Sequence, residues 1–233
     1  MFSKRELNKR VLVSITGVTD NHWKNKIKEI NSLGLKKVAL FNERFTPVQR
    51  RGIYEALLDS CVDEIPFVHG KNDMTKDEFK FLMNNFETKR FNIHVNGFNY
   101  LNKWKGNYKY LFAELSYHNK LPKGFDINKI GGFCVDLAHF KCAEERWSNE
   151  FDYIINNKKH EKLFQCNHIS GYSPRRRRDI HMIRKITSFD YLKSLPKFLF
   201  GQNIAIEVDN SIINQLRYRD YIIELLSQRK SYK

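Results

Sequence analysis

The sequence lacks the features that mark secreted, disulfide-stabilised or membrane-spanning proteins. Its four cysteines are spread over 233 residues without a CxxC pair or the spacing of a disulfide framework. Cys134 and Cys166 fall inside apolar segments, so we expect reduced core thiols in a cytoplasmic protein. The basic segment 1–10 is followed only by the short apolar run 11–18, which predicts neither a signal peptide nor a transmembrane segment.

Acidic residues are scarce relative to basic ones. Lysine and arginine number 41 against 26 aspartates and glutamates, which gives a net charge of +15 distributed along the chain. Such an excess favours an anionic partner, either nucleic acid or a phosphorylated metabolite. A general bias towards Lys, Asn and Ile would also produce solvated basic faces without a partner.

Short apolar segments alternate with helical periodicity, as expected of βα units around a parallel sheet. Strands are predicted at Val11–Thr16, Lys37–Phe41, Glu64–His69, Phe91–Val95, Tyr108–Leu115, Gly131–Asp136, Leu163–His168 and Ile204–Val208. Helices are predicted up to Gly34 and then over 47–58, 76–86, 138–155, 189–195 and from Ile212 onward. No linker or low-complexity segment interrupts this pattern. It predicts an α/β fold, a single-domain (β/α)8 TIM barrel over residues 1–233, with an open doubly wound sheet as the alternative.

Residues that can bind a metal ion occupy the carboxyl ends of the predicted strands, where barrel active sites lie. Period-two alternation turns them into the barrel, together with the residue two positions earlier in each strand. From the third strand to the eighth, with the loop after the seventh, these residues are His69, His94, Glu114, Asp136 with His139, His168, Asp179 with His181, and Glu207.

Each of these residues has an ordinary structural explanation when taken alone. A single histidine at a strand end is more often a hydrogen-bonded structural residue than a ligand. However, five of the chain's eight histidines fall in these places together. Carboxylates clustered at a barrel mouth would repel one another unless a cation neutralised them. The sequence therefore predicts a metal site formed by the strand ends.

Three segments carry a family resemblance: VDLAH at 135–139, NHISGYSPRRRRDIH at 167–181 and AIEV at 205–208. Together with the order of the strand-end residues, they resemble the endonuclease IV family of AP endonucleases, within the xylose-isomerase-like barrel superfamily. The resemblance covers nearly the whole chain in topology but only these motifs in residues. It implies that the protein binds DNA, acts as a monomer and has no contact with a membrane.

The resemblance also implies up to three Zn²⁺ ions, with Mn²⁺ or Fe as other possible metals. Glu114 would bridge the first two ions, and His139 would pair with Asp179 and His181 rather than with Asp136. The three implied ligand sets are His69, His94 and Glu114; then Glu114, Asp136, His168 and Glu207; and finally His139, Asp179 and His181.

Basic residues follow two of the predicted strands. Arg175, Arg176, Arg177 and Arg178 precede Asp179, in a region where barrels often bind phosphate. Arg44 follows the second strand, and we expect it to bind phosphate or the nucleic-acid backbone as well. The stretch 70–73 after the third strand reads Gly-Lys-Asn-Asp and lacks the apolar wedge that the family inserts into duplex DNA.

The leading hypothesis is a metal-dependent phosphodiesterase that hydrolyses the nucleic-acid backbone 5′ to abasic sites. Glu114 and Glu207 would be its catalytic residues, beside an activated water. The alternative is a sugar or sugar-phosphate isomerase or epimerase, in which the same two carboxylates move a proton beside a single divalent metal. That alternative gives no role to His69, His94, His139, Asp179 and His181. A multinuclear iron oxidase and a non-catalytic basic barrel that binds nucleic acid are further possibilities.

Overall fold

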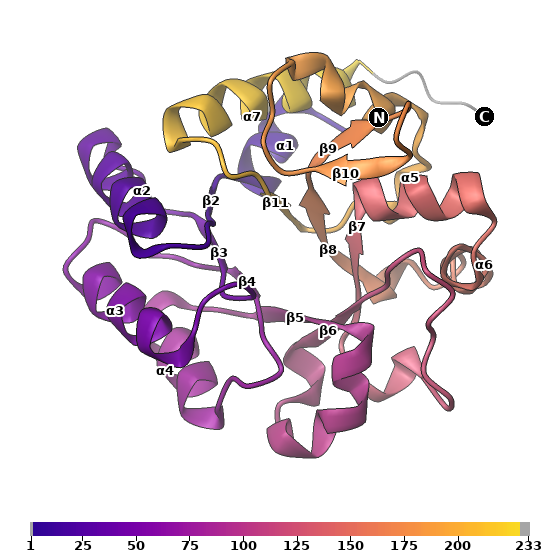
Figure 1. The fold of residues 1–233 in the computed structure, drawn as a ribbon, viewed down its shortest axis with the longest axis horizontal. Coiled ribbons are helices and arrows are strands. Elements are labelled where there is room, and N and C mark those ends of the chain that lie inside the picture. Colours follow the sequence, from indigo (N-terminus) through magenta and orange to yellow (C-terminus); the bar gives the residue numbers. More distant parts are fainter. Residues whose placement is uncertain (1, 229–233) are drawn as a thin grey trace.

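The computed structural model describes residues 2–228 and contains a parallel sheet that closes on itself (Figure 1). Its nine strands follow the order β1-β11-β8-β7-β6-β5-β4-β3-β2. The two end strands, β1 (Val11–Leu12) and β2 (Ser14–Ile15), are parts of one segment separated only by Val13. Within the described residues the nine strands therefore form an eight-stranded closed barrel. This confirms the predicted TIM barrel and excludes the open doubly wound sheet.

The remaining strands of the barrel lie where the sequence predicts strands, and each is parallel to its neighbours. Most are shorter than predicted, and in β3, β4 and β7 the residues that lack pairing lie at the amino-terminal side of the predicted segment. Lys37 and Glu64, the first residues of two predicted strands, form only an isolated bridge. The strands are β3 (Ala39–Phe41), β4 (Phe67–His69), β5 (Arg90–His94), β6 (Leu111–Glu114), β7 (Gly132–Asp136), β8 (Phe164–Ile169) and β11 (Asn203–Ile206).

Helices surround the barrel, as Figure 1 shows. They are α1 (Lys4–Arg10), α2 (Asp20–Leu33), α3 (Pro47–Leu58), α4 (Lys76–Phe86), α5 (Leu137–Arg146), α6 (Asn149–Asn156) and α7 (Ile212–Ser227). Shorter 3₁₀ segments lie at Val95–Trp104, Tyr108–Tyr110, Ile127–Lys129, Glu161–Leu163, Ile186–Ser194 and Lys197–Leu199. Capping boxes at Thr46 and Thr75 begin α3 and α4. Between residues 2 and 228, every helix is too short or too polar to cross a membrane.

The structure departs from the predicted helices after the sixth barrel strand. The predicted helix 138–155 is divided into α5 and α6, because Trp147 adopts a left-handed conformation with φ of 50°. The hydroxyl of Ser148 then accepts a hydrogen bond from the amide of Phe151 and begins α6. The predicted helix 189–195 is the 3₁₀ segment Ile186–Ser194. The basic loop contains an unpredicted antiparallel hairpin, β9 (Gly171–Ser173) with β10 (Arg178–Ile180).

Side chains inside the barrel form two layers. The lower layer is apolar, and its members are Leu12, Ala39, Phe41, Phe67, Phe112, Cys134, Cys166 and Ala205. Five of these lie two positions before a predicted metal-binding residue in the same segment, so the alternation of strand side chains places the polar residues directly above them. The four cysteines are free thiols, and Cys134 and Cys166 are buried, as the sequence predicts; Cys142 is buried as well.

A buried arginine holds together the loops on one side of the barrel mouth. Arg50 of α3 is fully buried, and its Nε donates to Oε1 of Glu78 at 2.7 Å. Its Nη1 lies 2.9 Å from Oδ1 of Asp73 and donates to the carbonyl oxygen of Phe45 at 3.1 Å. One guanidinium group therefore joins helices α3 and α4 to the loops that follow β3 and β4.

Replacing Arg50 by methionine should destabilise the protein strongly. The substitution leaves the carboxylate of Glu78 partly buried without its cation, and breaking a buried pair in this way costs about 3–5 kcal/mol. Urea denaturation in excess chelator measures the loss in free energy of unfolding without a contribution from metal. Arg51→Met on the same helix is the matched control, since Arg51 is exposed. Equal stability of the two variants would contradict this role of Arg50.

Candidate metal centre

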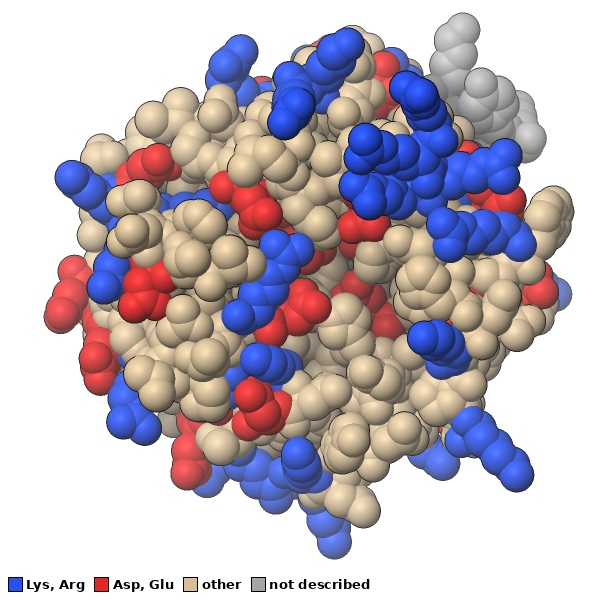
Figure 2. All heavy atoms as spheres, in the orientation of Figure 1, with Lys and Arg blue, Asp and Glu red and all other residues tan. Residues whose placement is uncertain are grey.

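The predicted strand-end residues all lie at one end of the barrel. Figure 2 shows a hollow in this face, with acidic side chains at its bottom. Glu114, Asp136, His69 and His168 are nearly inaccessible to solvent, whereas the remaining donors lie closer to the rim. His69, His94, Glu114 and Asp136 end strands β4 to β7, His139 lies in the first turn of α5, His168 lies in β8, Asp179 lies in β10, His181 follows β10 and Glu207 follows β11.

Glu114 lies at the centre of the cluster. Its Oε2 is 3.1 Å from Nε2 of His69, 3.4 Å from Nδ1 of His168 and 3.9 Å from Nδ1 of His94. Its Oε1 is 3.3 Å from Nδ1 of His139. The amide of Asn92 donates to Oε2 at 2.8 Å and fixes the rotamer of the carboxylate. One carboxylate therefore faces nitrogen atoms from four histidines.

A second carboxylate faces His168 from the opposite side. Oε2 of Glu207 is 3.4 Å from Nδ1 of His168, the same distance that separates this nitrogen from Glu114. The other ring nitrogen, Nε2, lies 3.2 Å from the amide oxygen of Asn92. Because an amide oxygen only accepts hydrogen bonds, Nε2 must carry the hydrogen. In the neutral ring, Nδ1 therefore presents its lone pair to two carboxylates.

A third group includes a residue of the β9–β10 hairpin, Asp179. Oδ2 of Asp179 is 2.7 Å from Nε2 of His181 and 4.0 Å from Nε2 of His139, and Tyr117 donates to Oδ1 at 3.2 Å. The other nitrogen of His139, Nδ1, is 3.9 Å from Oδ2 of Asp136. The ring of His139 thus faces carboxylates on both sides. Its assignment to an ion with Asp179 and His181 rather than with Asp136 stays a prediction.

Buried polar atoms without hydrogen-bond partners test whether the site fits a metal. Among the described residues, Oδ2 of Asp136, Nδ1 of His139 and Nδ1 of His168 are buried and have no partner in hydrogen-bond geometry. Burying such atoms is unfavourable unless something else satisfies them. Donors about 2.0–2.2 Å from one ion lie roughly 3–4 Å apart, which matches the distances in this cluster. The residues therefore fit divalent cations that prefer nitrogen and oxygen ligands.

Close pairing of acids with imidazoles shifts the pKa values of both. Burial disfavours protonated His69, but the hydrogen bond and charge of Glu114 outweigh this and raise its pKa to about 9. Burial likewise opposes the charge of Asp136, which raises the pKa of Asp136 to about 6. For His139, burial is outweighed by the charge of Asp136 and by Glu114, so its pKa rises to about 10. Without a metal, protons hold the cluster together.

The structure adds three residues that sequence reasoning missed. Glu43, in the loop after β3, lies 3.0 Å from Nε2 of His94 through its Oε1. Asn92 orients Glu114 and His168 from the middle of β5, and Tyr117 donates to Asp179. Glu43 follows a predicted strand end by two positions, so strand-end position could have suggested it. Strand alternation predicts that Asn92, two positions before His94, faces into the barrel, but it does not predict the partners of Asn92. Tyr117 had no such signal, because its partner comes from a distant segment.

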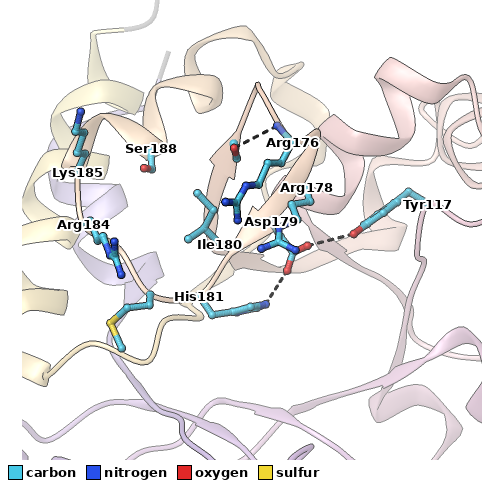
Figure 3. Close-up of a pocket in the computed structure, with 11 residues that line it drawn as sticks. Tyr117, Arg176, Arg178, Asp179, Ile180, His181, Arg184, Lys185 and Ser188 are labelled. Carbon is cyan, nitrogen blue, oxygen red and sulfur yellow. Dashed lines mark hydrogen bonds and ion pairs between the residues drawn. The ribbon is translucent and has the colours of Figure 1, made fainter.

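The predicted phosphate-binding arginines separate into two groups. Arg176 and Arg178 line a pocket of about 810 Å³ beside Asp179 and His181, with Arg184 and Lys185 from the following loop. Figure 3 shows Arg184 and Lys185 on one side of this pocket and Arg176 and Arg178 on the other. Two further arginines of the run lie outside this lining, namely Arg175 and Arg177, both exposed.

Arg44 also lies at the mouth, where it contacts a neighbouring loop. Its Nη1 is 3.3 Å from Oδ2 of Asp209, which follows β11, and both side chains are partly exposed. An exposed ion pair of this kind contributes little to stability. Arg44 can therefore exchange Asp209 for a phosphate oxygen at small cost, and its role in substrate binding stays a prediction.

Comparisons with known proteins add little to this description. No protein-family profile and no curated protein matches the sequence. Among solved structures, the chain is similar to one titled "Crystal structure of D-tagatose 3-epimerase-like protein", with 12% sequence identity and a TM-score of 0.49. The alignment covers 92% of this chain and 97% of that chain. At this TM-score the likeness carries no argument about chemistry, and the barrel assignment rests on the strand pairing.

Metal binding should release protons at neutral pH. A metal binds only the deprotonated nitrogen of an imidazole, while His69, His139 and His181 have pKa values raised to about 9, 10 and 9. The apparent metal affinity should therefore increase with pH until these pKa values are passed. Calorimetric Zn²⁺ titrations in buffers with different ionisation enthalpies count the protons released.

A pair of histidine variants tests whether the released protons come from the cluster. His139→Gln should reduce the number of protons released, because burial and two carboxylates surround this ring. His160→Gln removes an exposed histidine and should leave the count unchanged. An affinity that does not change with pH across the neutral and alkaline range would contradict protonation of the metal-free cluster.

Proposed function

We propose that this protein is a metal-dependent phosphodiesterase that acts on nucleic acid. The observation that carries the proposal is a donor set too large for one ion, directly beside a basic pocket. A single ion takes about four protein ligands at a site of this type. The mouth holds ten nitrogen- and oxygen-donor residues, namely Glu43, His69, His94, Glu114, Asp136, His139, His168, Asp179, His181 and Glu207.

Divalent ions bound there would supply a hydroxide at neutral pH and neutralise phosphate oxygens. The chain's own residues prepare the site for this chemistry. Glu114 and Glu207 both face Nδ1 of His168, and their negative charges would attract cations to this point. Arg176, Arg178 and Arg184 can donate to the phosphate oxygens of a strand that enters the pocket.

The finer part of the proposal is cleavage 5′ to an abasic site, which the family resemblance suggests. The loop after β4 offers no wedge for this purpose. Lys71 donates to the carbonyl oxygen of Phe45, and Asp73 pairs with Arg50. Exposed apolar side chains on segments that follow other strands include Tyr100, in the 3₁₀ segment after β5, and Met182, after β10. In this proposal they contact an unstacked nucleotide.

Purified protein saturated with Zn²⁺ or Mn²⁺ should incise a duplex that contains one abasic site, and excess chelator should abolish the incision. Glu114→Gln should reduce the rate by about 10²–10³-fold, because this carboxylate faces four histidines and one neutral amide cannot replace its charge. Gel electrophoresis of end-labelled duplex measures both effects. Incision of undamaged duplex or single strands alone would refute the abasic-site part, and no cleavage of any of these substrates would refute the phosphodiesterase.

The basic pocket should contribute affinity through phosphate contacts. Arg178→Ala or Arg184→Ala should weaken binding of an oligonucleotide, and each should reduce the slope of log affinity against log salt by about 1. Arg175→Ala is the matched control, since Arg175 belongs to the same basic run but does not line the pocket. Fluorescence anisotropy at several salt concentrations tests this. Equal slopes for all three variants would exclude a specific role for the pocket.

A second candidate is a sugar or sugar-phosphate isomerase or epimerase. The observation that favours it is the symmetric placement of Glu114 and Glu207, whose Oε2 atoms both lie 3.4 Å from Nδ1 of His168. With Asp136 these residues form a one-metal set with two carboxylates that could transfer a proton. Elemental analysis separates the candidates, since about three metal ions per chain favour the phosphodiesterase and about one favours the isomerase.

A further inference from the structure

Glu43 lies outside the donor pattern that resembles the endonuclease IV family, yet its carboxylate faces two histidines of the cluster. Its Oε1 is 3.0 Å from Nε2 of His94, and its Oε2 is 3.8 Å from Nε2 of His69. The ligand atoms of these three residues all lie within 4.8 Å of one another. Glu114 lies beside this group, 3.1 Å from Nε2 of His69 and 3.9 Å from Nδ1 of His94.

The turn that carries Glu43 is held in place on both sides. The backbone N–H of Asn42 donates to the carbonyl oxygen of His69 at 2.9 Å, and the backbone N–H of Phe45 donates to the backbone carbonyl oxygen of Asn42 at 3.1 Å. Asn42 and Phe45 are fully buried. Arg50 and Lys71 both donate to the carbonyl oxygen of Phe45. Glu43 is therefore presented by a rigid backbone, as a metal ligand requires.

The hydrogen bonding of His69 points to a cation between it and the two glutamates. Nδ1 of His69 lies 3.0 Å from the carbonyl oxygen of Gly70, and a carbonyl oxygen only accepts hydrogen bonds. The hydrogen of the neutral ring is therefore on Nδ1, which leaves the lone pair of Nε2 directed at Glu43 and Glu114. This is the arrangement of metal-bound histidines, whose second nitrogen donates to a carbonyl or carboxylate.

We propose that Glu43 is a fourth protein ligand of the divalent ion held by His69, His94 and Glu114. Four protein ligands make a closed site of the structural type, whereas a site with three keeps a position open for water. Glu43 thus takes the position that a three-ligand site keeps open for water, so this ion is not the one that activates water. The inference rests on the proposed function only in requiring metal at the barrel mouth.

Metal content tests the proposal independently of activity. Metal-free wild-type protein and Glu43→Gln are titrated with Zn²⁺ against a chromophoric chelator, and the ions that remain after dialysis are counted by elemental analysis. Glu43→Gln should weaken the affinity for one of the bound Zn²⁺ ions. The loss should exceed the factor of about 10–100 that is typical when a residue that only hydrogen-bonds to a metal ligand is removed. Glu55→Gln, an exposed glutamate of α3, should bind metal as the wild type does.

A second variant and a spectrum make the outcome decisive. Glu43→Asp keeps a carboxylate, so its affinity should lie between those of wild type and Glu43→Gln even if both variants lose some stability. With Co²⁺, the visible absorption of the wild type should change in Glu43→Gln and not in Glu55→Gln. Unchanged affinity and an unchanged spectrum in Glu43→Gln would overturn the proposal while leaving the metal-dependent function intact. A wild type that binds no metal would overturn both.

Discussion

The mouth of this barrel depends on one buried carboxylate. Glu114 is 2% exposed and lies within 3.9 Å of nitrogen atoms from four histidines. An isolated carboxylate would not stay ionised at such a position. Here the positive charge of the surrounding histidines, His168 and His94 above all, overcomes the effect of burial and holds the pKa of Glu114 well below its usual range. Whatever occupies the mouth must replace the positive charge that the protonated imidazoles provide.

The barrel and the convergence of the strand-end residues followed from the sequence because both depend on simple periodicities. Alternation along β7 and β8 places Asp136 above Cys134 and His168 above Cys166, and parallel pairing brings these pairs side by side. The positions of the strands in the sequence are therefore enough to predict that these side chains lie together. The closure of the sheet through the divided first strand was equally a consequence of eight repeats.

Other features were not predictable because they depend on contacts between distant segments or on single backbone conformations. The position of Glu43, two residues after the end of β3, was visible in the sequence, but its contacts with His69 and His94 depend on a turn that the buried Arg50 and Phe45 hold in place. The helix after β7 ends at Trp147, because that residue adopts a left-handed conformation that is uncommon for a bulky side chain. Such details are decided by tertiary packing, which a single sequence does not display.

The β9–β10 hairpin places two kinds of chemistry on one short strand. Arg178 and Asp179 are neighbours in β10, the first lining the basic pocket and the second paired with His181. Strand β10 pairs with β9 at only three positions, from Arg178 to Ile180. An anion bound in the pocket and a cation bound at Asp179 would therefore both act on this short hairpin. By thermodynamic linkage, any effect of the anion on the affinity for the cation would be matched by an equal effect of the cation on the affinity for the anion.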